Sequence, residues 1–276
     1  MTPSGHPDDV VTRAVCVGVN DYPIEGADLR GCVNDANAWA DLLTGSFDAR
    51  PDGITMLLDE AATRSAILAA VDDMVAASRR GDVAVFTNSS HGTYVVDRDG
   101  DETDHYDEAL CPWDVRRAPL VDDVLRRHLD EARAGVHLVV ISDSCHSGTG
   151  TRGGPPPPDA HPRFLDPVTI GLVPGRRSGP SPSQPARRSR SRAQSTMREL
   201  FLAGCRDDQF SYDAKIGRRY HGAMTFHAVR LIKAAGGDLT WAELHQQLGA
   251  ALAEAGFDQE PRLEGRTRHK HRRVFR

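Results

Sequence analysis

A histidine and a cysteine each follow a short apolar run, and together they could form a nucleophile and its base. Residues 83–87 lead into a polar loop that contains His91, and residues 138–141 lead into a loop that contains Cys145. Each run predicts a buried strand, and reactive residues of open parallel sheets lie just beyond the carboxyl ends of such strands. A histidine at that edge could remove the thiol proton, because the thiolate is the nucleophilic form of cysteine. The backbone amides of Gly92 and Cys145 could form an oxyanion hole.

Each residue of this pair also has a structural interpretation. A single cysteine at a strand end is most often a small buried hydrophobe, and a histidine followed by glycine is common in turns. Their joint placement favours catalysis, because both lie in small, polar, glycine-containing loops after apolar strands. His146 is a competing base, but a sequence neighbour of the nucleophile usually points elsewhere.

Predicted strands and helices alternate along the chain. Apolar runs and helical periodicity predict strands at 13–19, 54–58, 83–87, 136–142 and 199–203, and helices at 34–44, 63–79, 120–133, 224–235 and 240–255. Thr63 can cap one of these helices, and Thr240 with Glu243 matches a capping box. The alternation predicts an α/β fold in which helices cover both faces of a mainly parallel central sheet.

Residues 149–196 break this pattern, because they are rich in proline, glycine, serine and arginine. Such a segment buries too little apolar surface to offset its ordering entropy, so we predict a disordered linker. Basic residues crowd 176–198 and 262–276, although the formal net charge is −5. No aromatic interleaving or nucleic-acid motif accompanies them, which favours solvated faces over nucleic-acid binding.

The composition excludes several other classes of protein. Five scattered cysteines, with no Cys-x-x-Cys pair and no secretory signal, argue against a disulfide framework and a structural zinc site. No apolar run approaches the length needed to span a bilayer. Since the N-terminus is short and polar, we expect a cytoplasmic protein without membrane contact.

Several segments resemble the motifs of metacaspases, a branch of the caspase-like cysteine peptidases, and occur in that family's order. The similar segments are residues 29–36, 90–93 (Ser-His-Gly-Thr), 107–112, 143–148 (Asp-Ser-Cys-His-Ser-Gly), 204–209 and 222–225. His91 and Cys145 are also separated by roughly the 50 residues typical of caspases. Two features differ. Ser90 stands where the family usually has glycine, and the caspase signature Gln-Ala-Cys-x-Gly is absent, which favours the metacaspase branch, in its bacterial type.

The resemblance implies cleavage after Arg or Lys and a specificity pocket, which maps onto Cys32, Asp35, Ser89 and Asp143. The chemistry agrees, because two carboxylates at neighbouring strand ends would attract a cation, and arginine suits bidentate pairing. The alternatives are that Asp35 belongs to the exposed or capping start of its helix and that Asp143 is a turn residue.

The resemblance also divides a caspase-like α/β/α sandwich into parts. Residues 1–148 would form the large-subunit-like catalytic region, 149–196 the linker, and 197–276 the small-subunit-like region that completes the same fold. An extended, accessible linker is open to proteolysis, so self-cleavage is a further expectation. Candidate sites that match the specificity are Arg176, Arg177, Arg187, Arg188, Arg190 and Arg192, with Arg163 as another. The alternative is a basic linker that is never cut.

An acidic region raises the question of calcium. Residues 97–108 superficially match an EF-hand loop, but Glu102 stands where that loop requires glycine, so we reject an EF-hand. The resemblance offers a different Ca²⁺ site, at Asp107 with Asp122 and Asp123. The alternative is that Asp122 and Asp123 are favourable charges at a helix N-terminus.

Taken together, these patterns predict a cysteine endopeptidase that acts on polypeptides with basic residues at the cleavage site, and we expect a monomer. One alternative is a catalytically weak caspase-like scaffold that binds proteins, for which Ser90 is the best argument. The other is a nucleic-acid-binding protein that uses the basic segments, for which salt-dependent retention on DNA would be the support.

Overall fold

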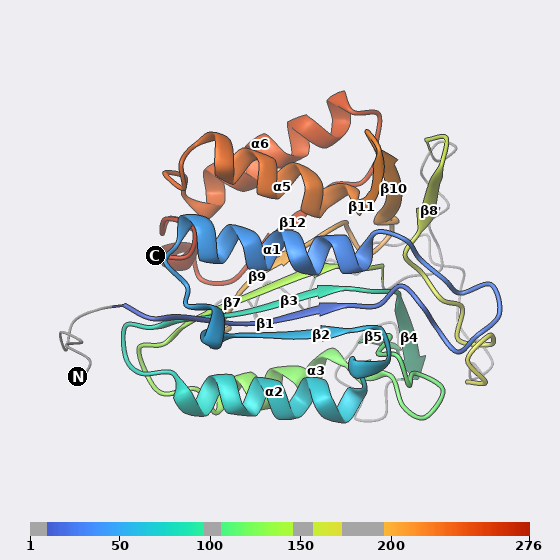
Figure 1. Cartoon of the computed structure of the whole chain (residues 1–276), viewed down its shortest axis with the longest axis horizontal. Helices are drawn as coiled ribbons and strands as arrows, with labels where there is room; N and C mark the ends of the chain where they lie inside the picture. The colour runs from blue at the N-terminus through green and yellow to red at the C-terminus, as the bar shows by residue number, and fades with distance from the viewer. Residues whose placement is uncertain (1–9, 97–105, 146–156, 173–195) are drawn as a thin grey trace.

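A six-stranded sheet with the order β12-β9-β7-β3-β1-β2 forms the centre of the molecule (Figure 1). The computed structural model describes residues 10–96, 106–145, 157–172 and 196–276. The strands are β1 (Thr12–Gly18), β2 (Ile54–Leu58), β3 (Val83–Ser89), β7 (His137–Asp143), β9 (Leu200–Ala203) and β12 (Arg262–Glu264). All neighbours pair in parallel except β12, which is antiparallel to β9 at one edge. The predicted α/β fold with a mainly parallel sheet is confirmed.

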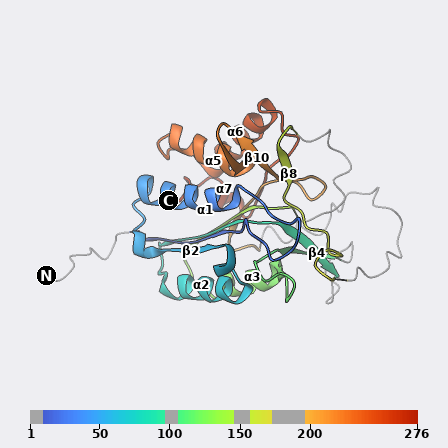
Figure 2. The same ribbon diagram turned by 45° about the vertical axis from the view of Figure 1, so that its right-hand side comes forward.

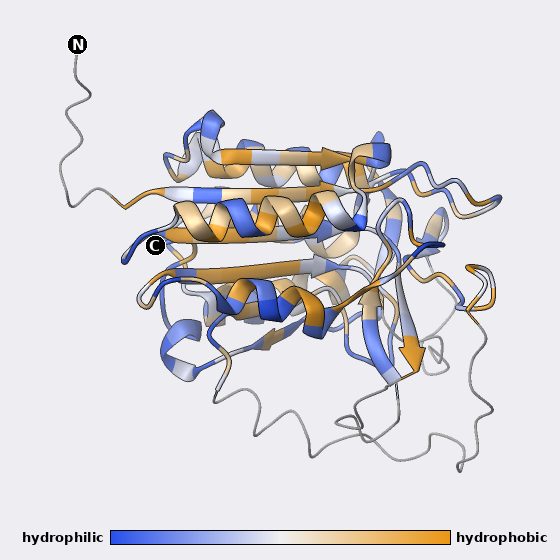
Figure 3. Cartoon of the chain, turned by 90° about the horizontal axis from the view of Figure 1, so that it is seen from below, coloured by the Kyte–Doolittle hydropathy of each residue, from blue (hydrophilic) through white to orange (hydrophobic). Residues whose placement is uncertain are grey.

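Helices cover both faces of this sheet. One face carries α1 (Cys32–Ser46), α5 (Ala223–Ala234) and α6 (Trp241–Glu254), and the other carries α2 (Arg64–Ala77) and α3 (Asp122–Asp130). Strand β1 shows why both faces need cover: Ala14 and Cys16 belong to one buried cluster, whereas Val15 and Val17 belong to the other. The central strands are accordingly hydrophobic along most of their length (Figure 3).

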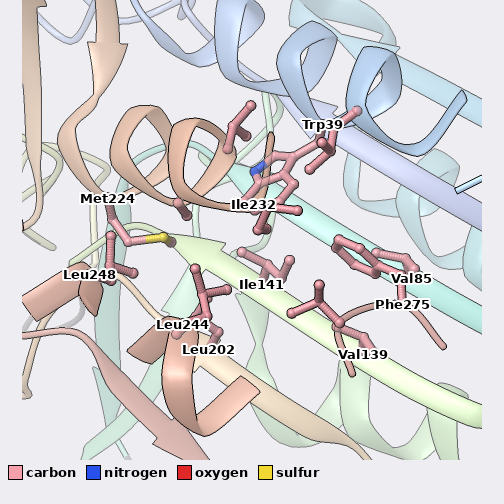
Figure 4. Packing of buried hydrophobic residues seen from close by; sticks show 14 of the residues in the cluster. Trp39, Val85, Val139, Ile141, Leu202, Met224, Ile232, Leu244, Leu248 and Phe275 are labelled. Atoms are coloured by element: carbon pink, nitrogen blue, oxygen red, sulfur yellow. The ribbon is translucent and has the colours of Figure 1, made fainter. Parts of the chain in front are cut away.

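The first of these clusters joins both halves of the sequence (Figure 4). Phe275, next to the last residue, lies edge-on to Trp39 of α1 with ring centroids 6.2 Å apart, and 5.1 Å from Trp241 of α6. Because β9 and β12 extend the sheet begun by β1, residues 197–276 contribute to the same core as the N-terminal part of the chain.

Two small sheets stand beyond the carboxyl ends of the central strands and were not predicted. One contains β4 (Gly92–Val96), β5 (Tyr106–Leu110) and β6 (Leu120–Val121), and the other contains β8 (Ala160–Pro162), β10 (Tyr212–Ile216) and β11 (Arg219–Gly222). Figures 1 and 2 show β8 beside β10, with which it pairs antiparallel. Short helices complete the described elements, at Pro51–Gly53, Asp59–Ala61 and Thr267–Lys270 (α7).

Local signals of the sequence have the expected structural effects. Thr63 accepts a hydrogen bond from the Ala66 amide at 3.2 Å, and both halves of the Thr240–Glu243 capping box are present. The helix predicted at 120–133 is shorter, because its first two residues pair with β5 and α3 begins only at Asp122.

Residues 157–172 of the predicted linker are ordered, and the rest of 149–195 lies outside the described residues. Within the described ranges, no helix has the length and apolar character needed to cross a membrane.

Candidate active site

The loops that follow β3 and β7 meet at one point. The two strands pair in register up to Ser89 and Asp143, so both loops begin at the same level. The amide of Gly92 and the amide of Cys145 donate to a single oxygen, the carbonyl of Arg163, at 2.9 Å and 3.2 Å. A Cβ atom on residue 92 would lie 1.8 Å from the Cys145 carbonyl oxygen, so only glycine permits this approach. The two amides predicted to form an oxyanion hole thus converge on one carbonyl oxygen.

The His91 ring is buried and held in one orientation. Its Nε2 atom lies 2.8 Å from the Ala27 carbonyl oxygen and donates to it, which leaves Nδ1 with the lone pair. Tyr22 lies against the ring with centroids 5.3 Å apart, and its hydroxyl accepts from the His91 amide at 3.2 Å. Among the described residues, Nδ1 has no hydrogen-bond partner. One ring nitrogen is therefore free to take a proton.

Burial also sets the protonation state of this ring. It lowers the pKa of His91 from its usual 6.5 to about 4, mainly because the charged form is removed from water. The hydrogen bond to the Ala27 backbone opposes this shift but does not overcome it. At neutral pH the imidazole is therefore uncharged, which is the state that a general base requires.

The Cys145 thiol is fully buried and lies against Ser211, which precedes β10. Its Sγ atom accepts from the Ser211 amide at 2.7 Å and lies 3.2 Å from the Ser211 carbonyl oxygen. A hydrogen bond with Cys145 and burial raise the pKa of the neighbouring Cys205 thiol well above its usual range. Cys205 thus stays neutral.

A cluster of carboxylates surrounds the side chain of Arg163. Its Nη2 atom lies 2.6 Å from Asp35 Oδ2 and 3.1 Å from Asp213 Oδ1, and its Nη1 atom donates to the Asp143 carbonyl oxygen at 3.0 Å. Asp143 Oδ2 lies 3.6 Å from the same Nη1, and all four side chains are fully buried. Burial alone would lower the pKa of the guanidinium, but the surrounding groups raise it well above its ordinary value. The Arg163 guanidinium therefore carries its full positive charge.

Other polar groups fix the carboxylates. The amide and hydroxyl of Thr225 donate to Asp143 Oδ2 at 2.9 Å and 2.8 Å, and the Gly222 amide donates to Asp35 Oδ2 at 2.9 Å. The Ser211 hydroxyl donates to the other oxygen of Asp143. Burial raises the pKa of the Asp143 carboxyl above its usual range, against the opposing effect of Arg163. The cluster is therefore stabilised by hydrogen bonds as well as by the cation.

The structure brings the predicted pocket residues to this cluster. Asp35 and Asp143 contact the guanidinium directly. Cys32 begins α1 and is fully buried, and burial raises the pKa of its thiol well above the usual range, against the opposing charge of Arg163. Ser89 pairs with Asp143 in the sheet register, which places both side chains on one face.

Sequence reasoning missed Asp213 and the contribution of Ser211. Asp213 lies on β10 and pairs with His161 and Gly222 across two neighbouring strands. The five-residue strand carries no continuous apolar run, but Tyr212, Ala214 and Ile216 alternate with polar residues, which is the pattern of a half-buried strand. An aspartate flanked by Tyr212 and Ala214, which are buried, was the available hint.

The predicted calcium ligands lie close together without forming a metal site of their own. Asp107 of β5 and Asp123 of α3 line one cavity of about 590 Å³. Arg126 pairs with Asp123 at 2.8 Å and with Asp122 at 3.3 Å. In the part of the chain that the structure describes, no group of three or more His, Cys, Asp or Glu side chains is arranged to hold a metal ion. The calcium site therefore stays a prediction.

Comparison with known proteins gives a consistent assignment. The family model for the metacaspase, peptidase C14 domain, matches residues 12–152. Metacaspase-1 of Pyricularia oryzae is 29% identical over 282 residues, which cover 91% of this chain and 70% of that protein. Metacaspase-1 of Arabidopsis thaliana is 30% identical, with 89% and 66% covered. Metacaspase-1 of Cryptococcus neoformans is 37% identical over 145 residues, so the chain matches only 32% of its length.

Solved structures support the fold. A protein of Geobacter sulfurreducens superposes with a TM-score of 0.69 at 24% identity, covering 96% of this chain and 98% of that one. Caspase-1 of Spodoptera frugiperda superposes with a TM-score of 0.57 at 11% identity, covering 96% and 95%. The chain therefore belongs to the metacaspase family, with a caspase-like fold.

Proposed function

We propose that the chain is a cysteine endopeptidase that cleaves peptide bonds after Arg or Lys, with Cys145 as nucleophile and His91 as general base. One observation carries the proposal. The guanidinium of Arg163 is fully buried among three aspartates while the carbonyl oxygen of the same residue receives the amides of Gly92 and Cys145. A basic residue and the carbonyl beside it thus occupy the positions that a specificity pocket and an oxyanion hole require.

Each group has a defined task in this reaction. His91 Nδ1 takes the thiol proton, and the thiolate attacks the carbonyl carbon that follows the basic side chain. Negative charge then develops on the carbonyl oxygen, where the amides of Gly92 and Cys145 donate to it. The Ala27 carbonyl keeps the imidazole in the tautomer that performs this transfer.

Charge in the pocket determines the specificity. The Nη2 atom of the guanidinium donates to both Asp35 and Asp213 while Nη1 donates to the Asp143 carbonyl oxygen, which a planar guanidinium can do and a neutral apolar side chain cannot. Lysine brings the same charge at a single point. An acidic side chain would add a further negative charge to a buried cluster of carboxylates and is rejected.

Ser90 was the best argument for the alternative of an inactive scaffold, but its hydroxyl forms two hydrogen bonds within its loop. The Ser90 hydroxyl donates to the His91 carbonyl oxygen at 2.8 Å and accepts from the Asn88 side-chain amide at 3.0 Å. The added side chain is thus bonded within its own loop. This arrangement favours the enzyme over the scaffold.

The catalytic unit is proposed to be a monomer. The edge strand β12 has three residues, and very short edge strands discourage pairing between chains. Sedimentation of the purified protein across a range of concentrations tests this, and a dimer at every concentration would reject it.

The test of specificity uses peptides that differ only in the residue before the scissile bond. Wild type should hydrolyse the Arg and Lys peptides at least about 100-fold faster than the Asp peptide, because the charged hydrogen bonds to Asp35 and Asp213 are both lost, at roughly 1.5–3 kcal/mol each. Cys145→Ala should hydrolyse none of them. Faster turnover of the Asp peptide would overturn the pocket assignment.

A further inference from the structure

Basic residues from four separate segments of the chain gather at one end of the molecule. This is the end of the sheet at which the parallel strands begin, and Figure 1 shows the C-terminus there, with β4 and β8 at the opposite end. The candidate active site lies beyond the other ends of the same strands. We call this group the basic face, and its members are Arg80 after α2, Arg133 before β7, Arg198 before β9, and Arg266, Arg268 and Arg272 near the C-terminus.

The first three members lie next to one another. A Cβ atom on Gly135 would lie 2.7 Å from Arg80 Cγ, so the Arg80 side chain borders the loop that carries Arg133. On the same loop, the carbonyl oxygen of Arg133 accepts a hydrogen bond from Arg198 Nη2 at 3.4 Å. Three connecting segments, which follow α2, follow α3 and precede β9, thus meet at this end of the sheet.

The C-terminal segment extends the same surface. Arg266 Nη2 donates to the carbonyl oxygen of Thr196 at 3.2 Å, two residues before Arg198. Arg272 Nη1 contacts the ring of His137, which is the first residue of β7. The basic face is therefore continuous from the end of α2 to the last residues of the chain.

The cations of this face have other basic groups as neighbours. Arg268 Nε lies 3.3 Å from His269 Nε2. The pKa of His269 is lowered to about 4 by burial first, and then by the nearby charges of Arg268 and Arg272. Among the described residues, neither Arg268 nor Arg272 forms an ion pair with a carboxylate. The face therefore carries a positive potential that an anionic partner would reduce.

Carboxylates lie at the edge of this face. Arg273, next to Arg272, pairs with Asp238, and Asp130 and Glu131 are exposed at the end of α3. The formal net charge of the chain is −5, so the positive potential is local. Since charges are screened over about 8 Å at physiological salt, a partner that touches the face experiences the local charge and not the net charge.

We propose that the basic face binds the phosphate backbone of duplex nucleic acid without regard to base sequence. Arginine suits this ligand, because its planar guanidinium pairs with phosphate oxygens through two parallel hydrogen bonds. The aromatic rings beside the C-terminal segment, Phe47, Trp241 and Phe275, are buried and so offer no surface on which unpaired bases could stack. The inference does not depend on the proposed peptidase activity.

The basic runs of the sequence do not contain this face. Arg80 and Arg133 belong to neither run, and the fold adds them to the C-terminal one. Four members have exposed side chains, namely Arg80, Arg133, Arg268 and Arg272. Phosphate contacts by such side chains are the main source of sequence-independent affinity for nucleic acid.

Two other anionic partners fit this face less well. Helices that bind an anionic membrane insert large apolar side chains, and protein interfaces have an apolar centre. Among the described residues, Val10, just before β1, is the one large hydrophobic side chain exposed at this end. A phosphate backbone needs no apolar contact, so the exposed arginines are sufficient for it.

The test measures the fluorescence anisotropy of a labelled DNA duplex as the purified full chain is added, at several salt concentrations. If the four exposed arginines each neutralise one phosphate, the slope of log K against log salt concentration is about −3.6. Wild-type affinity should therefore fall roughly 100-fold between about 50 and 200 mM salt. Arg268→Gln combined with Arg272→Gln should reduce the slope to about −1.8 and weaken binding at least about tenfold at the lower salt concentration.

Two control variants distinguish charge at this face from charge in general. Arg268→Lys combined with Arg272→Lys keeps the charge and should keep the salt slope. Arg116→Gln combined with Arg117→Gln removes the same charge from exposed positions between β5 and β6, at the opposite end of the molecule, and should bind as wild type does. Circular dichroism should show all three variants folded, because every substituted side chain is exposed.

A wild-type chain that does not bind the duplex at about 50 mM salt overturns the inference. An equal loss of binding in the control at positions 116 and 117 also overturns it, and so does an unchanged salt slope in the glutamine variant at positions 268 and 272. Preferential binding of phosphatidylserine vesicles, of polyglutamate or of a single-stranded oligonucleotide would identify a different partner and overturn it too. A chain that binds the duplex as expected but hydrolyses no Arg peptide would contradict the proposed function alone.

Discussion

Replacing Arg163 with glutamine in a chain that also carries Cys145→Ala separates the energetic role of the buried cation from cleavage. The guanidinium lies 2.6 Å from Asp35 Oδ2 and 3.1 Å from Asp213 Oδ1, and every side chain involved is fully buried. Removing one partner of a buried pair typically costs about 3–5 kcal/mol, because the remaining charges stay buried without compensation. Against a domain stability of about 5–15 kcal/mol, this is a large fraction.

The molecule has one way to reduce that cost. If residues 160–165 leave the site, water can reach the carboxylates, and the loss is limited to the free energy with which the segment was bound. We therefore expect either a lower urea midpoint or faster hydrogen exchange at the Arg163 and Leu165 amides, which are bonded to Ser211 and Gly92 in the parent. An unfolding free energy within about 1 kcal/mol of the parent, with both amides still protected, would refute the reasoning.

The deficit should depend on pH in a defined direction. Burial raises the pKa of the Asp143 carboxyl even in the presence of Arg163, and without the cation this shift grows. A carboxyl with a raised pKa binds its proton more tightly in the folded state, so stability falls as pH rises through the window above its ordinary value. The variant should thus recover part of its stability at acid pH. Arg50→Gln is the control, because the Arg50–Asp52 pair is 74% and 70% exposed and contributes at most about 1 kcal/mol.

Four further predictions concern the site. His91→Ala should lower kcat by roughly 10²–10⁴-fold in the peptide assay, and a wild-type rate would exclude it as the base. Asp213→Asn should lower kcat/KM for Arg peptides by about 10–100-fold while the folded state survives, since one charged hydrogen bond of roughly 1.5–3 kcal/mol is lost; equal activity would remove Asp213 from the pocket. The acid limb of self-cleavage should lie well below pH 6.5, because burial lowers the pKa of His91 to about 4; any stability that depends on the neutral ring is present above pH 6.5 and is lost as pH falls through 4. Calcium should raise peptide turnover if Asp107 and Asp123 are among its ligands, with Asp123→Asn reducing the response, and activity indifferent to chelation would reject this.

The sheet and the edge that carries the candidate active site could be predicted because continuous apolar runs encode buried parallel strands. Val83 to Phe86 are all buried, and the strand continues two residues beyond the predicted end before the loop with His91 begins. The rule that reactive groups follow strand ends then placed His91 and Cys145 near each other without any side-chain geometry. Periodicity is a local property, and these elements are determined locally.

Elements that depend on distant partners could not be predicted in this way. Strand β6 is two residues long and exists because Leu120 and Val121 pair with β5. Asp213 likewise depends on distant partners, because it reaches the carboxylate cluster through the pairing of β10 with β8 and β11. In both cases the position of the residues depends on pairing across the fold, which a short sequence window does not contain.

The prediction of disorder is wrong for the segment around Arg163, and the reason is a different one. Composition predicts disorder when a stretch lacks enough apolar surface to bury, and 149–196 fits that description. Charge can also order a segment. The Arg163 guanidinium pairs with Asp35 and Asp213, and two amides donate to the carbonyl oxygen of the same residue. These contacts fix the backbone without a local hydrophobic core. A site built to bind an extended basic peptide will order such a peptide wherever the chain supplies one within reach. On the proposed function, the ordered stretch is a consequence of the specificity pocket itself, and the same carboxylates that would select a substrate also select this part of the linker.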